Sequence, residues 1–301
     1  MTPILSVRHL ASCIGFSPER LRQIEREIAA DLSTHYVVFS KVDAKGKVRT
    51  FRNPRPELKR LQRRLLENVF SRIPVSNIAH GGIRGHSPAT NATRHVGADW
   101  VATVDIRHFF PSVRHYIIYR MFRQDLRYGR DVARLLTRFT TVDSQLPQGA
   151  PTSTMLANML LSLTSDDAIE EVSVKNHLAV TRFIDDYAIS GADPRMVVNA
   201  IARALSRRRL RIWRKKAKLK IQPNSAPQEV TGLLVNSRKG PGVSKFKRDA
   251  IKAAIFQLSM LPPCERPKAV RSIKGRINHV RRFHAGSAAR LDGLLGMRMV
   301  P

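Results

Sequence analysis

The chain has 301 residues, of which 53 are Lys or Arg and 23 are Asp or Glu, so its formal net charge is +30. A chain of this length has room for about two domains, and 43% of its residues are hydrophobic, which excludes a disordered chain. Solubility requires a net charge of only about 2–8 in a small domain. The excess positive charge therefore indicates a polyanionic partner, and it favours nucleic acid over a membrane surface.

Features that mark membrane and secreted proteins are missing from the sequence. The longest apolar stretch, residues 155–163, is much shorter than the ~18–20 residues needed to cross a bilayer, so we expect no membrane partner. The N-terminal residues lack the pattern of a signal or transit peptide. Cys13 and Cys264 lie in no CxxC or Cys/His cluster, which predicts neither disulfides nor zinc and favours the cytoplasm.

The first predicted elements alternate between helix and strand. A helix after Pro56 is predicted by apolar residues at helical intervals, Leu58, Leu61, Leu65 and Val69. Residues 100–106 form an apolar run that predicts a buried strand ending at Asp105. After a turn rich in Pro and Gly, residues 153–163 predict a helix capped by Thr152 or Ser153.

The next segments predict a hairpin and a basic region. Two apolar runs, residues 179–184 and 187–190, flank Asp185 and Asp186, which predicts a β-hairpin with two carboxylates at its tip. A helical pattern follows over residues 196–205. Residues 207–220 are then dominated by Lys and Arg.

The last third of the chain predicts one strand and then helices. Residues 230–236 have strand character, and the pattern is helical from about residue 245, with a break at Pro262 and Pro263. Strands that alternate with helices indicate an α+β or α/β body, with the final basic helices as a smaller appended module.

The aspartate pair at the hairpin tip points to metal chemistry. Two adjacent like charges raise each other's pKa unless a cation neutralises them, and a divalent metal ion is a simple remedy. Asp105 ends another predicted strand, so neighbouring strands could bring all three carboxylates together. Two-metal phosphoryl transfer needs such oxygen ligands on rigid backbone. A lone Asp-Asp pair also fits a solvated turn, and we interpret Asp166 and Asp167 in that way, as an acidic helix face.

Three segments in chain order resemble conserved motifs of reverse transcriptases. Residues 104–112 (VDIRHFFPS) resemble the first motif, residues 146–153 (LPQGAPTS) the middle motif, and residues 183–186 (FIDD) the third. The third departs from the usual Tyr-x-Asp-Asp form, having Phe183 for Tyr and Ile184 for a small residue, which puts template or primer contacts near residue 184 in doubt. The resemblance implies that Asp105, Asp185 and Asp186 are catalytic. With Ile106 they would bind two Mg²⁺ ions.

Further segments are similar to one branch of that family, the bacterial retron reverse transcriptases. Residues 91–95 (NATRH) resemble its Asn-Ala-x-x-His signature, and residues 230–232 (VTG) its Val-Thr-Gly signature. The resemblance runs from about residue 45 to 260. Taken alone, the first signature could be a helix cap with a core histidine, and the second a strand with a bulge. The RNA-binding residues that we predict are Asn91, His95, Lys215, Lys218 and Lys220.

Four residues are predicted to bind the incoming nucleotide. Arg49 would neutralise triphosphate oxygens through bidentate contacts, although an ordinary surface arginine without a ligand is the alternative. Phe110 matches the family position that places a ring under the sugar, whereas Phe109 packs into the core. Gln148 resembles a residue near the nucleotide sugar and phosphate, although turn chemistry alone could explain its neighbours. Lys216 would protonate the leaving pyrophosphate, with a generic phosphate-binding run as the alternative.

We therefore expect an α+β right-hand polymerase. Fingers and palm would occupy residues 1–236, with an antiparallel palm sheet carrying the three Asp, and a short helical thumb would occupy residues 237–301. The resemblance implies RNA-templated DNA synthesis from deoxynucleoside triphosphates. A structured noncoding RNA would be both template and primer, the product would be RNA-linked single-stranded DNA, and the role would be antiphage defence with a separate effector protein.

Two other interpretations stay open. The chain could be another bacterial reverse transcriptase, associated with CRISPR or with abortive infection, and the absence of an adjacent structured RNA gene would favour this. It could also be a non-catalytic RNA-binding subunit with a polymerase fold. The intact carboxylate trio argues against the second interpretation.

Overall fold

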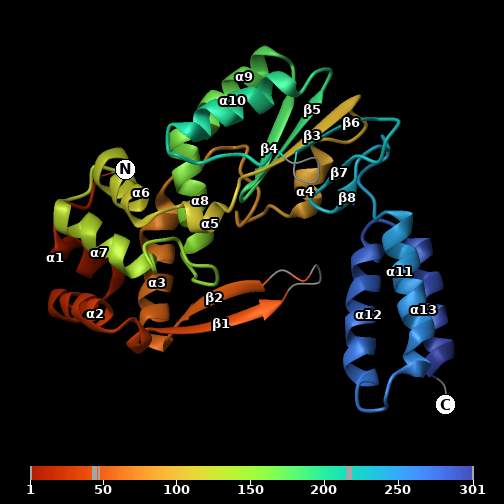
Figure 1. Ribbon diagram of the computed structural model, residues 1–301, viewed down its shortest axis with the longest axis horizontal. Coiled ribbons are helices and arrows are strands. Elements are labelled where there is room, and N and C mark those ends of the chain that lie inside the picture. The colour runs from red at the N-terminus through yellow and green to blue at the C-terminus, as the bar shows by residue number, and fades with distance from the viewer. Residues whose placement is uncertain (1, 43–45, 47, 215–218, 300–301) are drawn as a thin grey trace.

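The computed structural model describes residues 2–42, 46, 48–214 and 219–299 (Figure 1). Helices dominate the N-terminal part, an antiparallel sheet with helices against it forms the middle, and three helices form the last described part (Figure 1). This agrees with the α+β class expected from the sequence. Among the described helices, none is long and apolar enough to cross a membrane.

The N-terminal part combines helices with one two-stranded sheet. Its elements are α1 (Val7–Ile14), α2 (Pro18–Ala30), η1 (Leu32–Thr34), β1 (Tyr36–Val42), β2 (Val48–Pro54), α3 (Pro56–Asn68) and η2 (Phe70–Arg72). The two strands are antiparallel, with Arg49 on β2 opposite Lys41 on β1. Helix α3 confirms the helix predicted after Pro56, because its apolar face is buried and its first residue is that proline.

A second group of helices comes just before and just after the first strand of the main sheet in the sequence. Its members are α4 (Pro88–Thr93), α5 (Phe109–Ser112), α6 (His115–Arg120), the π-helical turn η3 (Met121–Asp125) and α7 (Arg130–Thr140). Helix α7 contacts both α2 and α6. It buries a stripe of apolar side chains that includes Val132, Leu136 and Phe139. This packing joins the N-terminal helices to the centre of the molecule.

The main sheet has four antiparallel strands in the order β4-β5-β3-β6. The strands are β3 (Trp100–Asp105), β4 (Ala179–Phe183), β5 (Asp186–Gly191) and β6 (Leu219–Pro223). The predicted strand at residues 100–106 and the predicted hairpin at residues 179–190 are both confirmed. Strand β6, at the end of the basic segment, was not predicted.

Helices cover the sheet, which separates two hydrophobic cores. On one side lie α8 (Ser153–Leu161), the π-helical turn η4 (Ser162–Asp166), α9 (Asp167–Lys175) and α10 (Arg195–Ser206) (Figure 1). Ala102, Val104 and Tyr187 belong to the larger core with α8 and α10, whereas Val101 and Ala188 belong to the smaller core. Successive side chains of a strand point to opposite faces, so β3 and β5 contribute to both cores.

The smaller core continues into the C-terminal helices. Its elements include β7 (Glu229–Val230), β8 (Leu233–Leu234), α11 (Lys245–Phe256), η5 (Gln257–Met260), α12 (Arg266–Arg281) and α13 (Ala285–Met299). Positive φ angles at Thr231 (47°) and Gly232 (85°) turn the chain, so the single strand predicted over residues 230–236 is a short hairpin instead. The domain boundary at residue 236 stays a prediction.

The turn between β4 and β5 has an unusual backbone conformation. Ile184 has φ = 62°, in the left-handed region, which costs a residue other than glycine roughly 1–2 kcal/mol and is rare for a β-branched side chain. Gly81 lies directly against this turn, and a Cβ atom at Gly81 would be 2.5 Å from the backbone nitrogen of Ile184. Only a residue without a side chain fits there.

We therefore expect Gly81→Ala to destabilise the protein by about 1–3 kcal/mol, because the added methyl group meets backbone that cannot move aside. Gly275→Ala is the matched control, since a Cβ atom there meets nothing within 4 Å and the residue lies within α12. It should stabilise the helix by about 0.5–1 kcal/mol. Thermal unfolding of the two variants checks the pair, and equal melting temperatures would contradict the close approach.

Candidate active site

Three aspartates lie at one end of the main sheet. Asp105 is the last residue of β3 and Asp186 the first of β5, and the strand register pairs the two directly. Asp185 precedes β5, and its backbone carbonyl accepts a hydrogen bond from the Ile106 N–H at 3.1 Å. Asp105 and Asp185 are half-buried, and Asp186 is exposed. Strand pairing thus brings together two carboxylates, Asp105 and Asp186, that are 81 residues apart in the chain.

A cavity of about 520 Å³ opens beside these carboxylates. Its walls come from β2, from the segment after β3, from the turn around residue 148 and from the β4–β5 turn. The cavity brings together seven of the residues singled out in the sequence: Arg49, Asp105, Ile106, Phe110, Gln148, Asp185 and Asp186. Lys216 lies outside the described residues.

The two phenylalanines after β3 differ in burial. Phe109 is 2% exposed and packs in the larger core, whereas Phe110 is half-buried, and both rings border the cavity. Their rings meet edge to face, with 5.5 Å between centroids. His108, just before them, has φ = 46° and caps α5, so the chain turns sharply between the strand and this helix. The placement of Phe109 in the core agrees with the sequence-based expectation.

The cavity also has residues that the sequence analysis did not identify. Arg52 on β2 lines it, forms an ion pair with Asp143 at 2.6 Å and donates its backbone N–H to the Gln148 carbonyl at 3.0 Å. Trp213 lines it as well, and its backbone N–H donates to the Asp105 carbonyl at 3.0 Å. No local pattern marks either residue, because each reaches the site through a contact with a distant segment.

The donor set suits divalent cations. Carboxylate oxygens are the ligands that Mg²⁺ prefers, and here two carboxylates lie on paired strands and the third in the turn that joins β4 to β5. A different group, Glu27, His35 and Glu57, also brings ligand atoms within 4.8 Å of one another. Arg20 forms ion pairs with both of these glutamates, so a cation of the chain already offsets part of their charge.

Asp166 corrects one expectation. It is not on an exposed acidic face: its side chain is fully buried and forms an ion pair with the equally buried Arg182 at 2.6 Å. The Tyr187 hydroxyl also donates to Asp166, at 3.0 Å, and burial together with this carboxylate raises the pKa of Tyr187 well above its usual range. Only Asp167, the next residue, is exposed. The expectation failed because the partner of Asp166 lies outside its own helical segment, on strand β4.

Asn91 and His95 are interior residues. His95 is 1% exposed, and its two ring nitrogens bond Ser190 and Thr181, each at 2.7 Å. Asn91 lies within α4 and is also 1% exposed. The burial and hydrogen bonds of His95 support the alternative of a core histidine, whereas Asn91 also lines a cavity with Asp105 and Lys220. An RNA-binding role for the two residues stays a prediction.

One of the predicted RNA-binding lysines, Lys220, belongs to β6. Lys220 is exposed on that strand, opposite Thr103 of β3, and Lys215 and Lys218 lie outside the described residues. A second cavity, of about 290 Å³, is lined by Lys220, Asp105 and Asp186. The aspartates at the end of β3 and β5 therefore border two cavities.

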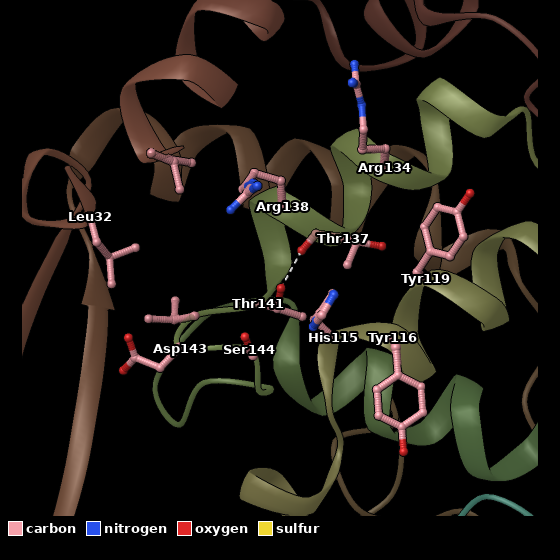
Figure 2. A pocket seen from close by; sticks show the side chains of 12 residues that line it. Leu32, His115, Tyr116, Tyr119, Arg134, Thr137, Arg138, Thr141, Asp143 and Ser144 are labelled. Atoms are coloured by element: carbon pink, nitrogen blue, oxygen red, sulfur yellow. Dashed lines mark hydrogen bonds between the residues drawn. The ribbon is translucent and has the colours of Figure 1, made fainter. Parts of the chain in front are cut away.

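A third cavity lies next to the first and is both basic and aromatic (Figure 2). It has a volume of about 500 Å³ and is lined by side chains of α6 and α7, among them His115, Tyr119 and Arg138. Ser144 borders this cavity, and the adjacent Gln145 borders the cavity with the three aspartates. One loop therefore separates the two.

Comparison with known proteins assigns the family. The family model for reverse transcriptase (RNA-dependent DNA polymerase) matches residues 20–235. The chain is 30% identical over 311 residues to the retron Mx162 reverse transcriptase of Myxococcus xanthus, covering 91% of this chain and 63% of that protein. It is 31% identical over 303 residues to the retron Mx65 enzyme of the same organism, covering 94% of this chain and 69% of that protein.

A third relative is the retron Ec86 reverse transcriptase of Escherichia coli, 28% identical over 293 residues, with 96% of this chain and 88% of that protein covered. The chain therefore belongs to the reverse transcriptase family of RNA-dependent DNA polymerases, and its relatives place it with the retron type. It spans about two thirds of the length of the two Myxococcus relatives.

The buried His95 generates a prediction on pH. Burial lowers its pKa to about 3, so the folded protein keeps it neutral while the unfolded chain binds a proton below about pH 6.5. The contribution of His95 to the free energy of unfolding is therefore fully present above that pH and is lost as the pH is lowered. Between about pH 7 and pH 5 we expect a loss of about 2 kcal/mol from His95 alone.

Chemical denaturation at the two pH values measures this loss. His95→Gln should be less stable at neutral pH and should lose less stability on acidification. A variant with the same pH dependence as the original protein would show that His95 is not the group responsible. His80 acts in the same direction, because burial and His86 lower its pKa to about 4, so some pH dependence should persist in the variant.

Proposed function

We propose that this chain catalyses RNA-templated DNA synthesis from deoxynucleoside triphosphates. The observation that carries the proposal is the cavity where Asp105, Asp185 and Asp186 meet Arg49 and Gln148. These residues come from segments far apart in the sequence, and membership of the reverse transcriptase family supports the same activity.

Asp105, Asp185 and Asp186, with Ile106, would hold two Mg²⁺ ions. When bound, such ions stabilise the attacking and leaving oxygens of a phosphoryl transfer. The chain itself contributes placement: the register of β3 and β5 holds Asp105 opposite Asp186, and the bond from Ile106 to the Asp185 carbonyl ties the turn to the strand end. A primer hydroxyl then reacts at the α-phosphorus of the nucleotide, and pyrophosphate leaves.

Residues of the cavity wall would bind and select the nucleotide. Arg49 neutralises triphosphate oxygens, and Gln148 lies near the sugar and phosphate, in a turn that is tied to β2 by the bond from Arg52. Phe110 supplies a ring under the sugar and excludes a ribose 2′-hydroxyl. Lys216 is our candidate for the acid that protonates pyrophosphate.

The parts of a right-hand polymerase can be assigned to this fold. We infer that the four-stranded sheet is the palm, that the N-terminal helices with β1 and β2 belong to the fingers, and that α11 to α13 form the thumb. The corresponding domains are residues 1–236 and 237–301. The cavity with the three aspartates then lies between fingers and palm, because β2 and β3 both line it.

A structured noncoding RNA is the proposed template and primer. The formal charge of +30 supports binding of the RNA backbone, and Lys215, Lys218 and Lys220 lie in the most basic segment. The cavity with His115, Tyr119 and Arg138 combines rings with cations, which suits single-stranded nucleic acid. It lies one loop away from the proposed reaction site.

The retron relatives suggest the biological setting. The product would be RNA-linked single-stranded DNA, primed from an RNA 2′-hydroxyl in the cytoplasm, and the role would be antiphage defence with a separate effector protein. Sequencing the nucleic acid that copurifies with the protein tests this setting. Recovery of one structured RNA joined to DNA supports it, whereas RNA without attached DNA favours a different bacterial reverse transcriptase.

The activity itself is tested by removing a carboxylate. Asp105→Asn or Asp185→Asn should abolish primer extension on an RNA template in Mg²⁺, because each removes a charged metal ligand without touching the basic surface. RNA affinity should stay largely unchanged. Asp167→Asn is the matched control, with the same loss of charge at an exposed helical position. Near-normal extension by either active-site variant would falsify the assignment.

Sugar selection generates a second test. Phe110→Val should incorporate ribonucleotides far better relative to deoxynucleotides, since a smaller side chain leaves room for the 2′-hydroxyl. Phe109→Ala should instead lower stability by about 3–5 kcal/mol, because that ring is buried in the core. The measurement is the ratio of incorporation efficiencies on one RNA template, with thermal melts beside it. Unchanged selectivity in the Phe110 variant would remove this ring from the selection mechanism.

A further inference from the structure

The turn that carries Asp185 and Asp186 is supported from behind by a buried polar network. Arg182 on β4 is fully buried, and its Nη1 donates to the backbone carbonyl of Ile184 and to the Asn158 side-chain carbonyl, each at 2.8 Å. Its Nε and Nη2 donate to the Asp166 carboxylate, the latter at 2.6 Å. One guanidinium thus joins the turn to α8 and to η4.

The network also reaches the other segment that contacts the turn. Asn158 donates from Nδ2 to the Gly81 carbonyl at 2.8 Å, and Gly81 packs against the Ile184 backbone. The backbone of Arg182 is bonded to the same segment, because its carbonyl accepts from the His80 N–H at 2.7 Å. The strained residue Ile184 is therefore held through its carbonyl on one side and packed against Gly81 on the other.

Stability alone is a weak explanation for such a pair. Burying two charges costs several kcal/mol per ion, and well-packed apolar residues of similar volume often serve equally well or better. What apolar residues cannot provide is a donor for the Ile184 carbonyl. Ile184 has a left-handed backbone that is unfavourable by roughly 1–2 kcal/mol. A hydrogen bond to its carbonyl stabilises this conformation, and the conformation sets the direction of the next two residues, Asp185 and Asp186.

We propose that Arg182 is a positioning residue that holds the Ile184 turn so that Asp185 and Asp186 face Asp105. Asp166 is its counterion and fixes the plane of the guanidinium. The proposal rests on the proposed function in one respect, namely that these carboxylates bind divalent cations. A lysine cannot replace Arg182, because a single ammonium group lacks the planar fork that reaches Asp166, Asn158 and the Ile184 carbonyl together.

Arg182→Lys tests the proposal through metal affinity. Binding of Mn²⁺, followed by the electron paramagnetic resonance signal of the free ion, should weaken by about tenfold in the folded variant, and primer extension should need correspondingly more Mg²⁺. If Arg182→Lys does not fold, Asp166→Glu keeps both charges, shifts the guanidinium by one methylene and carries the same expectation. A folded variant with unchanged Mn²⁺ affinity would overturn the proposal.

A control and a rescue separate positioning from general destabilisation. Tyr187→Phe removes a hydrogen bond from Asp166 and leaves the contact with Ile184, so it should lower the melting temperature without changing Mn²⁺ affinity. Glycine adopts positive φ without strain, so Ile184→Gly in the Arg182→Lys background should restore most of the Mn²⁺ affinity. If the control weakens Mn²⁺ binding as much as Arg182→Lys, or if the rescue fails, the role of Arg182 is only structural.

The outcomes also distinguish this proposal from the proposed function. A parent protein that binds Mn²⁺ in an Arg182-dependent manner and extends no primer would contradict the polymerase activity and leave the positioning role intact. A parent protein that extends primers, together with an Arg182→Lys variant of unchanged Mn²⁺ affinity, would do the reverse.

Discussion

Mutual repulsion of three carboxylates is the constraint around which this fold is arranged. The like charges of these carboxylates favour a larger separation. Backbone contacts must therefore set the positions of Asp105, Asp185 and Asp186. The β3–β5 pairing does this for two of them, because the register leaves Asp105 directly opposite Asp186. The third depends on the turn at Ile184, which the pairing alone does not determine.

The sheet transmits this constraint to both hydrophobic cores. Val104 packs into the larger core and Val101 into the smaller one, so shifting β3 by one residue would exchange the two faces and disrupt both. The register that pairs the aspartates is therefore protected by packing on both sides of the sheet. A change of register that destabilised the two cores would therefore also separate Asp105 from Asp186.

Local patterns were sufficient for much of the fold. The hairpin around Asp185, the strand ending at Asp105 and the helix after Pro56 each follow from spacing within a single segment, and all three are present. Strand β6 was not predicted because lysine and arginine dominate the segment before it. It nevertheless pairs with β3 through backbone hydrogen bonds that need no particular side chain. Its strand character comes from its neighbour.

The candidate site divides in the same way. Each of the three family-like motifs could be located in the sequence because it is short and continuous, and residues of all three line one cavity. Asp166 was misjudged because its partner, Arg182, lies on a separate element, strand β4. The buried contact of His95 with Thr181 of the same strand was not readable from the sequence for the same reason. A buried polar residue is recognised by its partner, and no single segment contains both.

Ile184 shows how distant contacts permit a local departure from a motif. Related motifs have a small residue where this chain has a β-branched one in a left-handed conformation. Part of the cost is offset by packing, because the Ile184 side chain lies against the larger core. Arg182 also donates a hydrogen bond to the Ile184 carbonyl, and Gly81 packs against the backbone of the turn. Tolerance of isoleucine at this position is thus a property of three segments together.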